Sequence, residues 1–510
     1  MLGERRLWEL VEARARATPD GLLAVDEQDR VLTFRDLETR ATRVAAAVAD
    51  LGVGAGSTVA WQLPTGLDAI VLVAALARLG AVQVPMLPIY REKEMRFILR
   101  QTAPRLLLTR SSWRGFAYED VAHALACELE LACDIVAVDA GLPERADRTA
   151  ATLAPVGPDD DPVRWIFYTS GTTADPKGAR HTDGTIAVAA ASVAESYAID
   201  ATDRYPIVFP FTHIGGIGML FIQLLTGCGA VAVEQFVAGQ TPALLARHGV
   251  TIAAGGTPLA LVYLQQQRRQ PDVPLLPDLR AVMTGAAPTP PALHSELKRE
   301  LGGTGAIACY GLTEAPFLTV SSVTDSDDKR ARTVGRPVAG AELRIVAADG
   351  HVCAPGESGE IQARGPQICR GFLDESRNAE AFDDGWFRTG DVGALDADGY
   401  LTITGRLKDV IIRKGENIAA KEVEDVLHEF RGVAEVAVIG LPDAALGERC
   451  CAVIVAREGA DPFGLADIAA FCRARGMAVQ KTPEQLALVD ELPRNASGKV
   501  LKYKLQERFA

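Results

Sequence analysis

The sequence has little of what an oxidised or membrane-embedded protein needs. Its 510 residues contain nine cysteines, an odd number scattered without a C-x-x-C pair, which is typical of reduced thiols. The most apolar window, residues 69–77, stops at Arg78 and is too short to span a bilayer. The first ten residues carry charges within their apolar run and do not resemble a signal peptide. We therefore expect a cytoplasmic protein with no stable membrane insertion.

The chain also has fewer basic than acidic residues. The chain has 53 Lys and Arg residues against 66 Asp and Glu residues, which gives a formal net charge of −13. A general nucleic-acid binder needs a basic surface, so this balance argues against nucleic acid as a partner. An anionic ligand would have to be held by a few local cations. Since 510 residues are too many for one compact core, two or more domains are expected.

One stretch, residues 168–178, has the composition of a phosphate-binding loop. It reads Y-T-S-G-T-T-A-D-P-K-G and follows an apolar run at 163–168 that is typical of a buried strand. An Ala-rich helical segment comes after it. Gly171 allows close approach of the backbone, and Lys177 supplies a compact positive charge. Hydroxyl donors are offered by Ser170, Thr172 and Thr173. Pro176 stands where a Walker A loop needs its second glycine, so this is a different phosphate loop or a surface turn.

Strand-like and helix-like segments alternate through the first 320 residues. Helices are predicted at 67–79, closed by Gly80, and at 91–101, and each precedes a strand, at 81–85 and 105–109. Further strands are predicted at 207–209, 230–234, 250–254, 280–284 and 306–310. The alternation predicts an α/β fold with doubly wound, mostly parallel sheets. Ligands of such sheets bind at the carboxyl ends of the strands.

Three loops at such strand ends carry candidate functional residues. The first, F-P-F-T-H-I-G-G at 209–216, contains His213, although a histidine beside aromatic residues is often a packing or capping residue. The second is the glycine turn T-G-A-A-P at 284–288. The third, Y-G-L-T-E, has Tyr310 to stack on a flat base and Thr313 to donate to a phosphoryl oxygen. Its Glu314 offers a hard oxygen ligand for magnesium.

Beyond residue 320 the sequence predicts two further units. Short strands at 342–346, 360–363 and 400–404, separated by Gly, Asp and Pro turns, indicate a small β-rich subdomain. It contains G-W-F-R-T-G-D, ending at Asp391, and G-R-L-K-D, which includes Arg406. A carboxylate is a natural acceptor for two ribose hydroxyls, and a nearby arginine can steady the same sugar. The last hundred residues have α+β patterns, with strands at 433–439, 452–455 and 486–489 and a helix at 465–475.

Six of these segments, in this order, resemble the motifs of the adenylate-forming superfamily. That group includes acyl- and aryl-CoA ligases, peptide-synthetase adenylation domains and luciferases, and the chain looks most like an acyl-CoA ligase. The resemblance implies a large N-terminal domain over residues 1–407 and a small mobile lid domain over residues 408–510. Lys408 would be the hinge. The segment P-R-N-A-S-G-K near the C-terminus matches the turn that carries the family's mobile catalytic lysine, here Lys499.

The resemblance also implies a set of site residues. Catalytic roles fall to Lys499, Thr313, Glu314 and His213, with Glu314 also the ligand of Mg²⁺. ATP and AMP would be bound by Thr169, Ser170, Gly171, Thr172, Thr173, Lys177, Gly285, Ala286, Ala287, Tyr310, Gly311, Asp391 and Arg406. Coenzyme A, as acceptor substrate, would approach Gly415, Glu416 and Asn417. His213 would line the acyl pocket and the thiol route.

The implied activity is AMP-forming ligation of a carboxylic acid to CoA through an acyl-AMP. Passing the acyl group to a carrier protein in trans or to a nitrogen nucleophile is one alternative. A degenerate nucleotide sensor is another, but it would be expected to have lost Lys499, Glu314 or Asp391, and all three are present. Asp183 stands where relatives often have histidine, which could mark an unusual substrate. The sequence does not identify the acid or decide whether the chain forms a homodimer.

Overall fold

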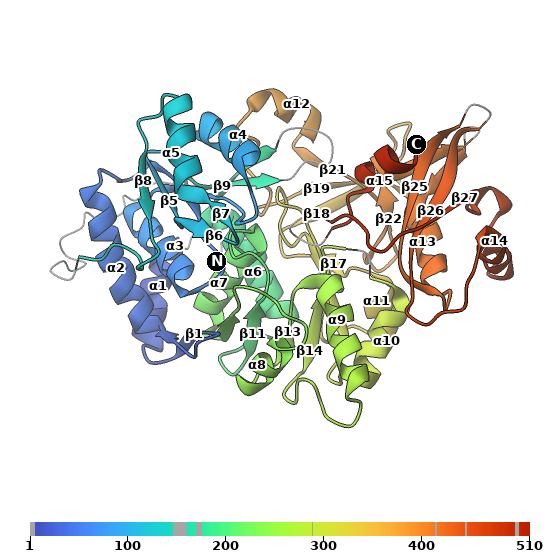
Figure 1. Ribbon diagram of the computed structural model, residues 1–510, viewed down its shortest axis with the longest axis horizontal. Coiled ribbons are helices and arrows are strands. Elements are labelled where there is room, and N and C mark those ends of the chain that lie inside the picture. The colour runs from blue at the N-terminus through green and yellow to red at the C-terminus, as the bar shows by residue number, and fades with distance from the viewer. Residues whose placement is uncertain are drawn as a thin grey trace.

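The computed structural model describes residues 6–145, 161–169, 176–287, 289–413, 416–443, 446–494 and 499–510, with only the backbone of 416 and 417. Figure 1 shows a larger body that contains α1 to β22 and, at one end, a smaller body that runs from β23 to the C-terminus. The helices of the larger body are α1 (Leu7–Ala17), α2 (Phe34–Asp50), α3 (Leu67–Leu79), α4 (Glu92–Thr102), α5 (Tyr118–Glu128), α6 (Asp183–Ser196), α7 (Ile214–Thr226), α8 (Thr241–Arg247), α9 (Gly256–Arg269), α10 (Pro291–Glu300), α11 (Asp327–Arg332) and α12 (Asn378–Ala381).

The first sheet of the larger body has the strand order β10-β9-β4-β3-β5-β8. Its members are β3 (Thr58–Gln62), β4 (Val82–Pro85), β5 (Leu106–Thr109), β8 (Asp134–Ala137), β9 (Val163–Thr169) and β10 (Lys177–Thr182). All neighbours are parallel except β9 and β10, which form an antiparallel hairpin. A small hairpin of β6 (Ser112–Trp113) and β7 (Phe116–Ala117) lies outside this sheet.

Two more sheets complete the α/β part. One has the order β11-β12-β1-β2 and the other β13-β14-β15-β16-β17. Their members are β1 (Leu22–Asp26), β2 (Val31–Thr33), β11 (Arg204–Ile207), β12 (Gly229–Ala232), β13 (Ile252–Ala253), β14 (Ala281–Thr284), β15 (Ala306–Tyr310), β16 (Thr319–Val320) and β17 (Arg336–Pro337). Pairing is parallel through β11-β12-β1 and through β13-β14-β15, and antiparallel at the remaining edges. The predicted α/β class with mostly parallel sheets is confirmed.

An antiparallel sheet forms the β-rich subdomain. It contains β18 (Glu342–Val346), β19 (Gly359–Arg364), β20 (Phe382–Asp383), β21 (Trp386–Leu395) and β22 (Leu401–Arg406). The 3₁₀ turn η3 (Leu407–Asp409) follows β22 and leads into the smaller body. There, β23 (Val410–Arg413), β24 (Glu416–Ala419), β25 (Val433–Asp443), β26 (Gly447–Ala456) and β27 (Gln485–Leu488) form a sheet with α13 (Ala420–His428), α14 (Leu465–Ala474) and α15 (Lys502–Phe509).

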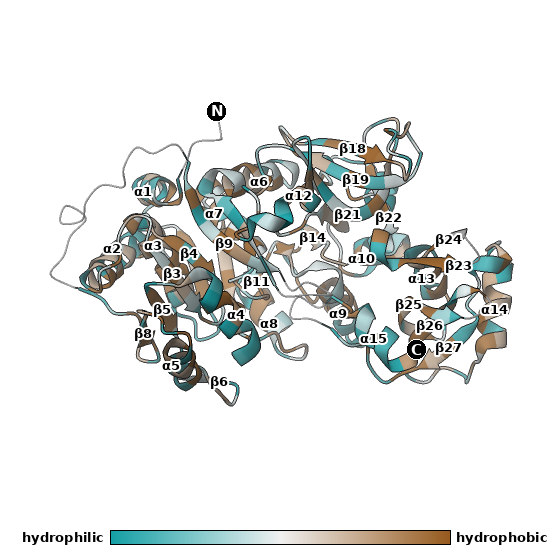
Figure 2. Cartoon of the chain, turned by 90° about the horizontal axis from the view of Figure 1, so that it is seen from above, coloured by the Kyte–Doolittle hydropathy of each residue, from teal (hydrophilic) through white to brown (hydrophobic). Residues whose placement is uncertain are grey.

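The largest hydrophobic core lies between the helices and sheets of the first 340 residues. Every residue of α3 from Ala69 to Leu76 is buried, and α3 packs on α2. Figure 2 shows hydrophobic residues gathered on strands such as β3 and β4 inside this body, with hydrophilic residues on outer helices. α3 ends at Gly80, which is left-handed as predicted. No helix in the described part of the chain is long and apolar enough to cross a membrane.

Most predicted strands are present with small shifts at their ends, but two elements differ. The structure has strand β10 between the phosphate-loop stretch and α6, where the sequence suggested a direct passage into a helix. The strand predicted at 207–209 is β11, which ends at Ile207. Beyond it, the carbonyl of Phe209 and the N–H of Phe211 bond to the Thr65 hydroxyl at 2.9 and 3.0 Å instead of to a neighbouring strand. All nine cysteines are free thiols, as expected.

Candidate active site

The described ends of the phosphate-loop stretch belong to the β9–β10 hairpin. Thr169 at the end of β9 pairs with Lys177 at the start of β10, so the two predicted phosphate contacts lie side by side. The remaining predicted contacts in the loop, Ser170, Gly171, Thr172 and Thr173, lie outside the described residues. Gly178, the second residue of β10, packs closely on the Tyr168 ring of β9, since a Cβ on Gly178 would lie 3.0 Å from that ring.

A short segment at residues 369–373 holds the outer edge of this hairpin, and the sequence did not reveal it. The N–H of Leu373 donates to the Gly178 carbonyl, and Ala179 bridges Phe372. The Lys177 ammonium lies 5.5 Å from the centre of the Phe372 ring, a cation–π distance. At the other end of the segment, the N–H of Cys369 donates to the Glu314 carbonyl. The segment therefore joins the phosphate-loop hairpin to the Y-G-L-T-E loop.

His181, in the middle of β10, makes a second connection between the same two loops. Its Nε2–H donates to the Thr313 carbonyl at 2.8 Å, and its Nδ1 lies 2.9 Å from the Thr185 hydroxyl. The ring is fully buried, and burial lowers its pKa to about 4. His181 is thus a neutral side chain with a fixed tautomer. No sequence motif identified it, because its partner is a backbone atom 132 residues away.

The glycine turn after β14 has a shape that glycine alone permits. Gly285 has φ of +144°, and a Cβ on it would lie 2.4 Å from the Cys309 carbonyl oxygen. Ala286 follows in the left-handed region with φ of +58° and is exposed. Thr257 on α9 fixes the turn, because its N–H donates to the Gly285 carbonyl at 3.1 Å. The turn therefore presents Ala286 and Ala287 at the carboxyl end of the parallel strands, where the sequence placed a nucleotide contact.

Tyr310, Asp391 and Arg406 form one connected group. The Tyr310 hydroxyl donates to Asp391 Oδ2 at 2.7 Å, and Arg406 Nε lies 2.7 Å from Asp391 Oδ1. Asp391 and Arg406 face each other across β21 and β22 as a register pair. Asp391 lies within the ten-residue strand β21. The carboxylate is buried and oriented from both sides, which suits a group that binds a sugar hydroxyl.

Glu314 lies in the same electrostatic environment. Burial raises its pKa, while the charges of Lys177 and Arg406 oppose that rise and the charge of Asp391 reinforces it. Carboxylate oxygens are among the ligands that Mg²⁺ prefers, so the side chain fits a magnesium ion carried by a nucleotide. The role of Glu314 as its protein ligand stays a prediction.

Lys499, from the smaller body, faces this group. Burial, together with the nearby positive charges of Arg406 and Lys408, lowers the pKa of Lys499 to about 8, against the opposing charges of Asp391 and Asp409. The predicted catalytic lysine is thus within electrostatic range of the predicted ribose ligand, although 108 positions separate it from Asp391 in the sequence. The structure gathers cations from several distant segments into one place on an acidic protein.

His213 is positioned as the N-cap of α7. The N–H of Gly215 donates to His213 Nδ1 at 3.0 Å. Burial lowers the pKa of His213 to about 4, so the ring is neutral at ordinary pH and keeps its proton on Nε2. This is the capping role that the sequence left open. A contribution of Nε2 to the acyl pocket stays a prediction.

Lys408 lies in η3, between β22 and β23, where a hinge between the two bodies would be. A hollow of about 20 Å³ lies beside this turn and is lined by Lys408, Asp409, Val410 and residues of β25, β26 and α15. Glu416 and Asn417 open β24, and Gly415 lies outside the described residues. Their role toward coenzyme A and the domain boundary at 407/408 remain predictions.

Asp183 has a structural role that differs from the expectation of a substrate-marking residue. It is the first residue of α6, and its two carboxylate oxygens accept from the Leu7 N–H at 2.9 Å and the Trp165 Nε1–H at 2.8 Å. The side chain is buried, and this burial raises its pKa. Asp183 therefore ties together α1, β9 and α6 inside the core.

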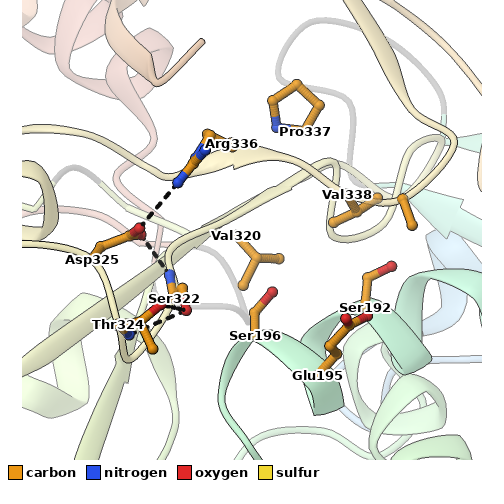
Figure 3. A pocket seen from close by; sticks show the side chains of 11 residues that line it. Ser192, Glu195, Ser196, Val320, Ser322, Thr324, Asp325, Arg336, Pro337 and Val338 are labelled. Carbon is orange, nitrogen blue, oxygen red and sulfur yellow. Dashed lines mark hydrogen bonds and ion pairs between the residues drawn. The ribbon is translucent and has the colours of Figure 1, made fainter. Parts of the chain in front are cut away.

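A separate hollow of about 240 Å³ lies between the C-terminal end of α6 and the strands β16 and β17 (Figure 3). Its wall includes Asp325, which accepts from the Ser322 N–H at 2.7 Å and lies 3.7 Å from Arg336. None of the predicted nucleotide, acid or coenzyme A residues lines it. This hollow is not part of the site described above.

Together, these contacts place a buried carboxylate and several cations within range of one another, as a nucleotide site requires. Comparisons with known proteins identify the family. Residues 11–373 match the family described as "AMP-binding enzyme", and residues 422–499 match "AMP-binding enzyme C-terminal domain". The chain therefore belongs to the AMP-binding enzyme family, and it is an AMP-forming enzyme of the acyl-CoA synthetase type.

Two relatives are similar over almost the whole chain. The medium-chain fatty-acid–CoA ligase of Escherichia coli (strain K12) is 30% identical over 517 residues, covering 99% of this chain and 90% of the relative. The 2-succinylbenzoate–CoA ligase of Bacillus subtilis (strain 168) is 30% identical over 510 residues, covering 99% of both.

One solved protein gives a structural comparison in two states. ATP-bound MatB from Rhodopseudomonas palustris has a TM-score of 0.89 at 26% identity, covering 99% of this chain and 98% of that one. Apo MatB, with the same coverage and identity, has a TM-score of 0.78. The present structure is therefore more similar to the nucleotide-bound form.

Proposed function

We propose that this chain is an ATP-dependent carboxylic acid–CoA ligase. The carboxylate attacks the α-phosphate of ATP to give acyl-AMP and pyrophosphate, and the CoA thiol then attacks the acyl carbon to give a thioester and AMP. The observation that supports this most strongly is the position of Lys499. A lysine from the smaller body is within electrostatic range of Arg406 and Asp391, the pair to which the ribose of ATP would bind.

The first step joins two anions, so its barrier is largely electrostatic. Lys499, Lys177 and Arg406 supply positive charge around the phosphate position, and Thr313 is held by His181 to donate to it. Magnesium, when bound with ATP at Glu314, would supply further charge neutralisation. The reaction needs no side-chain nucleophile and no general base. The neutral state of His213 is consistent with that, because it leaves only a hydrogen-bond donor toward the acyl pocket.

The second step needs a different arrangement, because Lys499 has no role in thiol attack. A rotation about Lys408 would withdraw it and bring 415–417 toward the thiol. The higher TM-score with ATP-bound than with apo MatB supports the view that the present arrangement is the one suited to adenylation.

The identity of the acid does not follow from the relatives. They are named for a medium-chain fatty acid and for 2-succinylbenzoate, which differ in shape and charge, and both are about equally similar to this chain. The proposal therefore extends to a small-molecule carboxylic acid and no further.

The test is release of AMP and pyrophosphate with magnesium-ATP over a panel of carboxylic acids, with and without CoA, and products identified by mass. Acid-dependent pyrophosphate release with a CoA thioester is the expected result. Pyrophosphate release without a thioester would contradict the CoA step and favour a carrier protein or a nitrogen nucleophile. ATP binding without turnover of any acid in the panel would count against the ligase and for a nucleotide sensor.

A further inference from the structure

The loop between β18 and β19 brings a histidine, a thiol and two carboxylates together on the surface of the β-rich subdomain. His351 Nδ1 lies 2.6 Å from Asp349 Oδ1, and His351 Nε2 lies 3.1 Å from Glu357 Oε1. The nearest ligand atoms of His351, Cys353 and Glu357 all lie within 4.8 Å of one another. None of these residues belongs to the nucleotide site.

Each of the three side chains is held in place by a further contact. Asp349 fixes the imidazole through Nδ1 and also accepts from the His351 N–H at 3.2 Å. The Ala354 N–H donates to Glu357 Oε2 at 3.0 Å, which leaves Oε1 directed at the histidine. The Cys353 Sγ lies 3.9 Å from the Ser358 carbonyl oxygen, the Cys353 N–H donates to the Ile345 carbonyl at 2.8 Å, and the residue packs against the subdomain core. The ligand set is therefore oriented before any ion arrives.

We propose that this loop binds a divalent transition metal of the zinc class, with His351 Nε2, Cys353 Sγ and Glu357 Oε1 as ligands. Nitrogen, sulfur and oxygen donors of this kind are those that Zn²⁺ takes in proteins, and a water would complete the tetrahedron. Asp349 plays the part of the carboxylate that commonly receives the second N–H of a metal-bound histidine. The sulfur ligand distinguishes this site from the proposed magnesium site at Glu314, because Mg²⁺ prefers oxygen ligands.

The cluster offers negative charge to a cation, because the Asp349 and Glu357 carboxylates lie 2.6 and 3.1 Å from the two ring nitrogens of His351. Binding of a divalent ion would release the thiol proton of Cys353 and take His351 as a neutral imidazole. In a tetrahedral zinc site the ligand atoms are about 3.3–3.8 Å apart, so the side chains need move only about an ångström.

The test uses Zn²⁺ on the full-length protein without ATP and follows alkylation of Cys353 by peptide mass spectrometry. One equivalent of Zn²⁺ should slow alkylation of Cys353 about tenfold or more, because a metal-bound thiolate is a poor nucleophile. His351→Ala and Glu357→Gln should remove most of this protection. His123→Ala, which removes an exposed histidine on α5, is the matched control and should leave the protection intact. Adenylation activity should be the same in all three variants.

A second readout uses Co²⁺ in place of Zn²⁺. The thiolate-to-cobalt charge-transfer absorption should be present in the unmodified protein and absent in Cys353→Ser. The proposal is overturned if Zn²⁺ leaves the Cys353 alkylation rate unchanged, or if His351→Ala is protected as well as the unmodified protein. Thermal unfolding of each variant without metal shows whether the loop substitution has altered the fold itself.

Discussion

Replacing Lys499 by arginine should change the pH dependence of adenylation in a defined direction. Lys499 must be protonated to neutralise the phosphate, and burial beside Arg406 lowers its pKa to about 8. The active form is therefore lost as the pH rises through about 8, well below the range in which an exposed lysine deprotonates. Arginine stays charged throughout this range, so the variant should have no such loss.

The size of the effect follows from the pKa. With a pKa of about 8, roughly nine-tenths of Lys499 is protonated at pH 7 and roughly one-tenth at pH 9. The kcat/KM for magnesium-ATP should thus fall about tenfold between those two values, because this ratio reports the free enzyme. Bound ATP brings negative charge to the lysine and raises its pKa, so the fall in kcat should occur at a higher pH. Lys499→Ala should lose about 100- to 1,000-fold at pH 7, the effect of removing one preorganised group that stabilises developing charge.

The assay is acid-dependent ATP–pyrophosphate exchange in the absence of CoA, so that ionisation of the CoA thiol does not contribute. Carboxylic acids remain ionised across the whole range. Lys499→Ala should still convert supplied acyl-AMP and CoA to thioester at close to the normal rate, which controls for a general loss of folding.

Two results would refute the reasoning. If Lys499→Arg loses activity between pH 7 and pH 9 as the unmodified enzyme does, a group other than Lys499 causes the fall of kcat/KM over that range. If Lys499→Ala slows both half-reactions equally, the lysine does not act specifically in adenylation.

Three other substitutions test single contacts of the structure. Lys408→Pro, which fixes one torsion of η3, should slow thioester formation more than pyrophosphate exchange, and equal slowing would contradict a hinge there. His181→Leu should lower kcat for adenylation by about ten- to a hundredfold through misplacement of Thr313, with a flat pH response; unchanged kcat would contradict a positioning role. In Asp183→Asn the amide NH₂ would face one of the two N–H groups that now donate to the carboxylate, so one hydrogen bond is lost. The free energy of unfolding should fall by about 1–3 kcal/mol, while the order in which the enzyme prefers different acids stays the same. A changed ranking would restore Asp183 as a specificity residue.

Much of the fold could be predicted because local signals were strong. The Gly80 stop of α3 and the apolar runs of β14 and β15 lie close to where periodicity and turn residues place them. Strand β10 was not predicted, since K-G-A-R-H-T alternates poorly and its pairing is with β9 and the segment at 369–373. β11 was misplaced because a side chain far away in the sequence, Thr65, takes the hydrogen bonds that would have continued the strand.

The site shows the same division. The resemblance to family motifs was enough to name Asp391, Arg406 and Lys499. In the structure Asp391 contacts Arg406, and Lys499 is within electrostatic range of both. The roles of His181 and of the segment at 369–373 could not be predicted, because both bond to backbone carbonyl groups, those of Thr313, Glu314 and Gly178. Every residue has a backbone carbonyl, so the sequence does not show which one accepts such a bond. The structural contacts of Asp183 could not be predicted for a related reason: its partners, the Leu7 N–H and Trp165, are distant in the chain.

The register pair of Asp391 and Arg406 has a consequence for the order of events during turnover. Arg406 is the last residue of β22, and only Leu407 separates it from Lys408. A nucleotide sugar bound to this pair would add hydrogen bonds to the contact that already joins the two strands, at the edge of the hinge. We expect AMP to leave last for this reason, because its ribose keeps the pivot of the lid in register until the thioester has departed.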